Sequence, residues 1–259
     1  MLTLAIVGGS ATLSADVDVT IFSVNNTVAN VVFTGNVSSV VHAVAIPNDG
    51  TLTFGQDGGT QTYNGGLTTT SVDGTVTLNG TITSSDDAIV LGAVTLASAT
   101  TIDTNSTTTN RADITLGAVT GGNNTLTLTT ENNITGSDVT ASGNITGVTT
   151  LTLASVGGTA TLSGDVDVTT LTVGNSVANV AFTGNGSSVT NAVSFANDGT
   201  LTLGQDGGTQ TYNAGLTTTS VGSTVTLNGT IATSDDAVVL GAVTLGSATT
   251  IDTNSTTTN

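Results

Sequence analysis

Short runs in which apolar residues alternate with threonine dominate the chain. Clear examples are Leu2–Leu4, Thr51–Phe54, Thr75–Leu78, Val94–Leu96 and Thr125–Leu128. An alternation with a period of two places the apolar side chains on one face of a β-strand and the threonines on the other. The pattern therefore predicts strands with one buried face, and it supports a helix nowhere.

Glycine, asparagine and aspartate punctuate these runs, as at Gly8-Gly9, Asn48–Gly50, Gly58-Gly59 and Asn79-Gly80, and such residues mark turns. Beyond residue 50, strands are expected to start near residues 51, 60, 67, 75, 81, 88, 94 and 100. This spacing is tighter than that of most β-sandwich domains. Three such strands make a coil of roughly 20–24 residues, which lies within the range of solenoid repeats.

A much longer repeat is also present. The sequence from Leu2 to Asn110 matches the sequence from Leu151 to Asn259 at an offset of 149 residues, with about four-fifths of the positions identical and no insertion. We therefore divide the chain into a first long repeat, residues 1–149, with about seven coils, and a second, incomplete repeat, residues 150–259. Because Met1 leads straight into repeat sequence, we expect a piece of a longer chain.

The predicted fold is all-β: one continuous parallel β-solenoid (β-helix), built from the 149-residue long repeat. Valine, leucine and isoleucine would form inward ladders, and large aromatic residues would crowd the narrow interior, which would explain their scarcity. No face can be assigned to Thr60–Tyr63. The alternative is a string of small β-sandwich domains. The residues that test the solenoid are Val76, Leu78, Leu91, Val94 and Leu96, expected inside, and Thr75, Thr77 and Thr95, expected outside.

Composition and net charge limit the kinds of partner and fold to be expected. The formal net charge is −17 and the only cationic side chain is Arg111, so nucleic acid is excluded as an expected partner because one arginine cannot neutralise a row of phosphates. An anionic membrane surface would repel the chain, and no apolar run is long enough to cross a bilayer. The absence of cysteine excludes a disulfide scaffold. Regularly spaced aliphatic residues and a charged fraction of 7% argue against disorder.

Two stretches, Asp113–Leu128 and Gly143–Leu153, resemble the repeats of large bacterial surface exoproteins, which include filamentous-haemagglutinin-like adhesins and autotransporter passenger domains. The resemblance covers nearly the whole chain, but it contains no signature residue. It implies a right-handed parallel β-helix, secretion to the cell surface, and a role in adhesion or in a surface fibre. It carries over no catalytic or binding residue, and the export route stays open.

The acidic pair Asp16 and Asp18 recurs as Asp165 and Asp167. Alternation places these carboxylates on the outer face if the intervening valines point inward. Calcium could bridge them, since it takes several hard oxygen ligands, but so few ligands are visible that we expect solvated acidic strands and assign no metal site. The turns at Asp86-Asp87 and Asp235-Asp236 are judged in the same way.

No catalytic or cofactor-binding residue is assigned. The segment Gly55–Gly59 lacks the acidic series of an EF-hand and the Gly-Lys-Ser/Thr ending of a phosphate loop, so it is expected to be a plain turn. A Ser-His-Asp triad would need His42, the only histidine. Asn191 occupies the equivalent position in the second copy. Paired carboxylates could serve a glycosidase, but the basic or aromatic residues that hold sugar are scarce. We do not expect an enzyme.

Three functions are left for comparison. The first is a structural segment of a secreted bacterial surface fibre or giant adhesin, whose ends are covered by identical subunits or by further repeats of the same chain. The second is a stalk module that binds calcium or surface glycans, either on its faces or through the loop expected at Thr104–Asn110. The third, a polysaccharide-active β-helix enzyme, is the least favoured.

Overall fold

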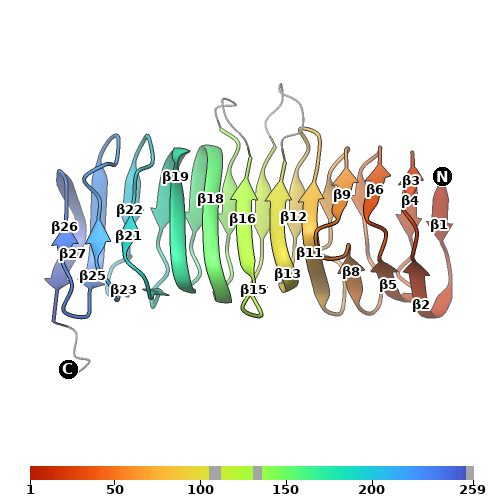
Figure 1. Ribbon diagram of the computed structural model, residues 1–259, viewed down its shortest axis with the longest axis horizontal. Coiled ribbons are helices and arrows are strands. Elements are labelled where there is room, and N and C mark those ends of the chain that lie inside the picture. Colours follow the sequence, from red (N-terminus) through yellow and green to blue (C-terminus); the bar gives the residue numbers. More distant parts are fainter. Residues whose placement is uncertain (105–111, 131–135, 255–259) are drawn as a thin grey trace.

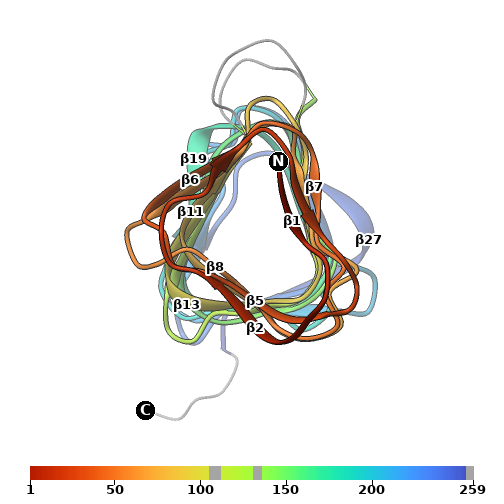
Figure 2. The same ribbon diagram turned by 90° about the vertical axis from the view of Figure 1, so that its right-hand side faces the viewer.

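The computed structural model describes residues 1–104, 112–130 and 136–254. These residues form a rod, a three-sided parallel β-solenoid of about 11 turns with the two termini at opposite ends. Figure 2 looks along the rod and shows its triangular outline. All pairings between the named strands are parallel, and the described residues include no helix that could cross a membrane. The solenoid prediction is confirmed, and the β-sandwich alternative is wrong.

Each side of the triangle is a stack of parallel strand segments, and we name the three sides faces A, B and C. Face A consists of β2 (Val7–Leu13), β5 (Val28–Phe33), β8 (Leu52–Phe54), the first parts of β11 (Val76–Thr83) and β13 (Val94–Asp103), β15 (Val119–Thr120), the first parts of β18 (Ile145–Leu162) and β19 (Val166–Phe182), β20 (Ser188–Val189), β23 (Thr209–Tyr212), and the last parts of β25 (Val225–Ala232) and β27 (Val243–Asp252).

Faces B and C are built in the same way. Face B consists of β3 (Asp18–Val19), β6 (Val37–Val40), β9 (Thr60–Tyr63), the last parts of β11 and β13, β16 (Thr125–Thr129), the middle parts of β18 and β19, β21 (Val193–Ser194), β24 (Leu216–Thr217) and β26 (Val238–Val239). Face C consists of β1 (Leu2–Leu4), β4 (Phe22–Val24), β7 (Val44–Ala45), β10 (Leu67–Thr68), β12 (Ile89–Leu91), β14 (Ile114–Leu116), β17 (Val139–Ala141), the last parts of β18 and β19, β22 (Leu201–Leu203), and the first parts of β25 and β27.

Some strands continue around the corners of the triangle. β18 pairs in turn with β15, β16 and β17, so this single strand covers all three faces. Its register shifts at the corner between Thr146 and Val148, where Gly147 has a φ of 66°. A positive φ is readily adopted only by glycine and a few polar residues, which explains why Gly and Asn punctuate the alternating runs.

The interior is filled by the aliphatic rows that the alternation predicts. Val76, Leu78, Leu91, Val94 and Leu96 are all at most 3% exposed, while Thr75, Thr77 and Thr95 lie on the outer surface, fully or partly exposed. In the segment without an assigned face, Gln61 and Tyr63 point inward, and Thr60 and Thr62 are partly exposed. The inward ladders are therefore confirmed.

The aromatic residues do not avoid the interior, contrary to the expectation that they would crowd it. All seven are at most 4% exposed: Phe22, Phe33, Phe54, Tyr63, Phe182, Phe195 and Tyr212. In the first copy they form a chain of ring contacts: Phe22 and Phe33 meet edge to face with centroids 5.3 Å apart, and Phe33 and Phe54 are stacked with centroids 5.6 Å apart. Phe22 and Phe33 belong to one coil, and Phe54 and Tyr63 belong to the next, so the triangular cross-section at this end is wide enough for two rings per coil.

The repeating unit of the solenoid is the single turn of about 21 residues, and not the 149-residue segment expected to build it. Successive turns vary in length, from 18 residues between Val76 and Val94 to 26 between Val119 and Ile145. One 149-residue repeat spans 20 strand segments, which is 6⅔ turns and close to the seven expected. Since this number is not whole, each copy starts on a different face: Ala11 lies on face A, and its counterpart Ala160 lies on face C.

Candidate functional site

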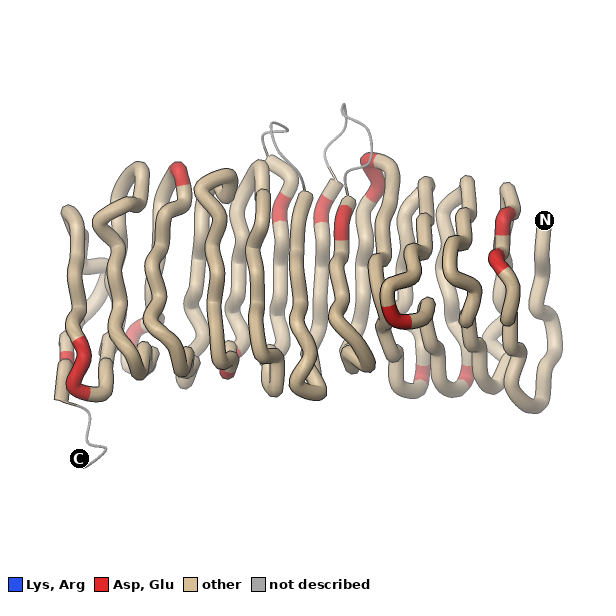
Figure 3. The backbone as a smooth tube through the Cα atoms, in the orientation of Figure 1, with Lys and Arg blue, Asp and Glu red and all other residues tan. Residues whose placement is uncertain are grey.

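The four aspartates singled out in the sequence lie on the outer surface. Asp16, Asp18 and Asp167 are exposed and Asp165 is partly exposed, while Val17 and Val166 between them are buried. The placement of these carboxylates is confirmed. Figure 3 shows that the acidic residues are scattered along the rod and that no cationic side chain lies among the described residues. Arg111 lies outside the described part.

The first aspartate of each pair has a structural role. Asp16 accepts a hydrogen bond at Oδ1 from the backbone N–H of Val37 (2.9 Å), and Asp165 accepts one from Gly186 (2.7 Å). Each bond joins a corner of one coil to the next coil. Because the carboxylate caps a main-chain donor that the strand ladder leaves open, this role alone accounts for the aspartate. Within the described ranges, no three His, Asp or Glu side chains are grouped so that they could hold a metal.

The remaining candidates are turns and an isolated side chain. Asp86 and Asp235 both adopt a φ of 62°, and Gly55 and Gly58 have φ values of 69° and 72°, so these residues are used for tight backbone turns. His42 is exposed on the surface. The loop expected at residues 104–110 lies, apart from Thr104, outside the described residues. Thr104 itself is buried, and its Oγ1 donates to the backbone carbonyl of Ala112 (3.0 Å).

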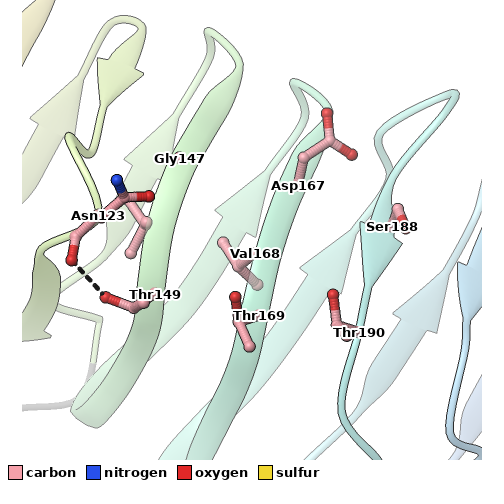
Figure 4. Close-up of a pocket in the computed structure, with 9 residues that line it drawn as sticks. Asn123, Gly147, Thr149, Asp167, Val168, Thr169, Ser188 and Thr190 are labelled. Atoms are coloured by element: carbon pink, nitrogen blue, oxygen red, sulfur yellow. Dashed lines mark hydrogen bonds between the residues drawn. The ribbon is translucent and has the colours of Figure 1, made fainter.

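The structure adds a groove that sequence reasoning missed. It has a volume of about 370 Å³ and is lined by residues of four adjacent coils, beside Asp167. Figure 4 shows the hydroxyl groups of Thr149, Thr169 and Thr190 side by side at one end, with Asp167 and Ser188 at the other. Thr149 Oγ1 donates to the backbone carbonyl of Asn123 (2.9 Å), which fixes the threonine at the edge of the groove.

Burial raises the pKa of the Asp167 carboxyl above its ordinary value. A hydrogen bond from the Ser188 backbone opposes this rise, and the nearby charge of Asp165 adds to it. The Asp167 side chain as a whole is exposed, but the groove screens part of its carboxyl from water, and the described part of the chain contains no lysine or arginine that could lie beside it. Such a groove offers hydroxyl groups, which donate and accept hydrogen bonds, and one carboxylate, which accepts them. The negative charge of the carboxylate repels anions.

The same groove recurs in the first copy. A second hollow of about 230 Å³ is lined by Asp18, Thr20, Ser39 and Val41, among others. These four residues stand 149 positions before Asp167, Thr169, Ser188 and Thr190. The recurrence could have been found from the sequence, because the acidic residue and the neighbouring hydroxyls repeat together. The sequence could not show that residues from four coils converge at the groove beside Asp167.

The comparisons with known proteins return nothing: no family model, no curated protein and no solved structure matches this chain. The site must therefore be interpreted from its own residues. Its hydroxyl groups and its one carboxylate are groups that can form hydrogen bonds with a polar ligand.

Proposed function

We propose that this protein is a structural segment of an extracellular surface fibre or adhesin, and that it extends by end-to-end stacking of solenoid coils. The observation that carries the proposal comes from comparing the two copies. Val94, Leu96 and Ile102 are 3%, 1% and 0% exposed, while their counterparts on the final strand, Val243, Leu245 and Ile251, are 40%, 61% and 47% exposed.

The difference has a simple cause. In the first copy the next coil covers these side chains through β15 and β16, whereas no described coil lies over β27. The opposite end shows the same effect, because Leu2, Leu4 and Leu13 are only partly buried, and their counterparts Leu151, Leu153 and Leu162 are at most 1% exposed. Both ends therefore present a surface that is core elsewhere in the same molecule.

Covering such an edge is strongly favourable. Complete burial of one large aliphatic side chain contributes roughly 1.5–3 kcal/mol, and the open ladder of N–H and C=O groups gains hydrogen bonds at the same time. The edge strands contain no lysine or proline to prevent this pairing. Since the two ends differ from each other, stacking is head to tail and does not close, which produces filaments. Further coils of a longer chain would satisfy the same surfaces.

An extracellular place and an adhesive role fit the acidic, cysteine-free composition and the resemblance to surface exoprotein repeats. We propose identical subunits or further repeats as the partners, and neither nucleic acid nor a membrane. A second candidate function is glycan binding along the rod, which the recurrent groove favours. Saturable binding of neutral oligosaccharides that Asp167→Asn abolishes would support this second function.

The stacking proposal is tested by placing a charge on the terminal edge. Leu245→Lys substitutes a side chain that is 61% exposed, so the fold should persist, but stacking would bury the ammonium group at a high cost. The matched control is Thr120→Lys, at an exposed residue on β15, which has further coils on both sides.

Light scattering and electron microscopy over a wide range of concentrations provide the measurement. We expect filaments from the unmodified chain and from Thr120→Lys, and monomers from Leu245→Lys. An unmodified chain that stays monomeric at every concentration would overturn the stacking proposal.

A further inference from the structure

The rod ends in a step at each terminus, because it is a continuous winding rather than a pile of closed rings. Faces A, B and C contain twelve, eleven and twelve strand segments, 35 in all for the described residues. The first segment, β1, lies on face C, and the last, the end of β27, lies on face A. Among the described segments, the lowest place at the C-terminal end is therefore over β26 on face B, where the next segment of the winding would lie.

We propose that copies of this chain stack with each molecule turned by one third of a turn about the rod axis, so that β1 of one molecule lies over β26 of the preceding one. In this arrangement β2 lies over the first part of β27, and β3 lies over its last part. The inference rests on the proposed function, and it specifies how the second copy is seated.

The same rotation already occurs inside the molecule. One long repeat of 20 segments and the whole chain of 35 segments both leave two segments beyond a whole number of turns. The junction between two molecules would therefore shift the faces in the same sense as the two copies within one chain, where residues on faces A, B and C have counterparts on faces C, A and B. At about 4.8 Å per turn, each molecule advances about 55 Å, and three molecules complete an axial repeat of about 165 Å.

Continuity of the ladders fixes the register at this junction. On face A, one outward row runs from Asp167 through Ser188, Thr211 and Ala232 to Asp252. Asp18 is the counterpart of Asp167 in the first copy. Placing β3 over the end of β27 with the row continued puts Asp18 of one molecule directly over Asp252 of the other.

This pairing of like charges is specific to the proposed rotation. The other two rotations would place β3 over β26 or over the first part of β27, and neither Val238–Val239 nor Val243–Leu245 contains a carboxylate. Like charges directly opposite each other in a sheet are unfavourable. The proposed junction therefore predicts that removing either charge strengthens stacking, whereas the other rotations predict no such gain from Asp18 and Asp252 together.

The experiment measures filament formation by Asp18→Asn and by Asp252→Asn, with Asp57→Asn as the matched control. Asp57 is exposed in a turn away from both ends, so its variant removes the same charge from the molecule without touching the junction. We expect the association constant to rise about two- to fivefold for each junction variant and to rise no further in the double variant. The control should change the association constant only by the effect of removing one negative charge from the whole molecule.

Helical reconstruction from electron micrographs of the unmodified chain provides the direct readout. A rotation of one third of a turn per molecule, with a rise of about 55 Å, would confirm the inference. Filaments with another rotation, or junction variants that behave like Asp57→Asn, would overturn the inference and leave the proposed function standing. Failure of every variant to form filaments would overturn both.

Discussion

At the residue scale, the two buried Gln–Tyr pairs show how the same sequence is used in both copies. In the second copy, Tyr212 Oη donates to Gln210 Oε1 (3.0 Å), and Gln210 Nε2 donates to the Phe182 carbonyl (2.8 Å). In the first copy, Gln61 Nε2 donates to the Gly35 carbonyl (3.1 Å), while Gln61 Oε1 and Tyr63 Oη have no partner. A buried polar group without a partner is costly, so the second pair is the better satisfied.

This difference predicts unequal effects of one substitution at two equivalent sites. Gln210→Leu removes a bond from Tyr212 and leaves its hydroxyl buried and unpaired, whereas Gln61→Leu takes no bond from Tyr63. We therefore expect Gln210→Leu to lower the free energy of unfolding by about 1 kcal/mol more than Gln61→Leu. Urea unfolding of the two variants is the measurement. Equal losses would show that the two pairs are equivalent in solution.

The buried tyrosines also predict a limit of stability at high pH. Burial raises the pKa of both Tyr63 and Tyr212 well above the ordinary value of 10.0. Above that pH the unfolded chain releases these protons and the folded chain does not, so the folded state loses stability as pH rises. Below about pH 10 the contribution is fully present.

Phenolate absorbance and circular dichroism, followed through the same alkaline titration, test this point. We expect both tyrosines to ionise together with unfolding. Phenolate that appears while the fold is intact would contradict the burial of these rings.

At the element scale, alternation and turn residues were sufficient to place most strands. The expected starts near residues 51, 60, 67, 75, 88 and 94 agree with β8 to β13 within about a residue. The starts near 81 and 100 instead fall inside β11 and β13, which continue around a corner. β11 bends at Asn79-Gly80, whereas β13 bends at Ala97–Ala99 without glycine or asparagine. Turn residues alone therefore do not show which corners break a strand and which only bend it.

The hydrogen bonds at the corners also explain why aspartate occurs there without a metal. Asp16 and Asp165 already accept main-chain hydrogen bonds from the next coil, as Asn30 and Asn179 do at other corners, from Thr51 and Thr200 (2.9 Å each). Asparagine carries no charge, so the shared role needs an oxygen acceptor and not a metal ligand.

We therefore predict that a chelator leaves the melting temperature nearly unchanged. A ligand that binds only the folded state stabilises it, so bound calcium would reveal itself as a large drop in melting temperature on chelation. Differential scanning calorimetry with and without chelator, and with calcium restored, distinguishes the two results.

At the scale of the whole molecule, the sequence predicted a continuous solenoid and misjudged its unit. The 149-residue identity is real, but the turns inside it differ in length, so it closes after 6⅔ turns rather than seven. Alternation reports which side chains point inward and contains no information on which of three similar faces a segment joins. The Asp167 groove was missed for the same reason, since its residues come from coils that only the winding brings together.

We propose that the rod stacks through its uncovered ends, and electron microscopy of the purified chain across a range of concentrations distinguishes stacked rods from single ones. Stacking predicts narrow straight particles whose lengths are multiples of about 55 Å and whose mean length grows with concentration. Particles of a single length at every concentration would contradict end-to-end stacking, and compact round particles would contradict the rod itself.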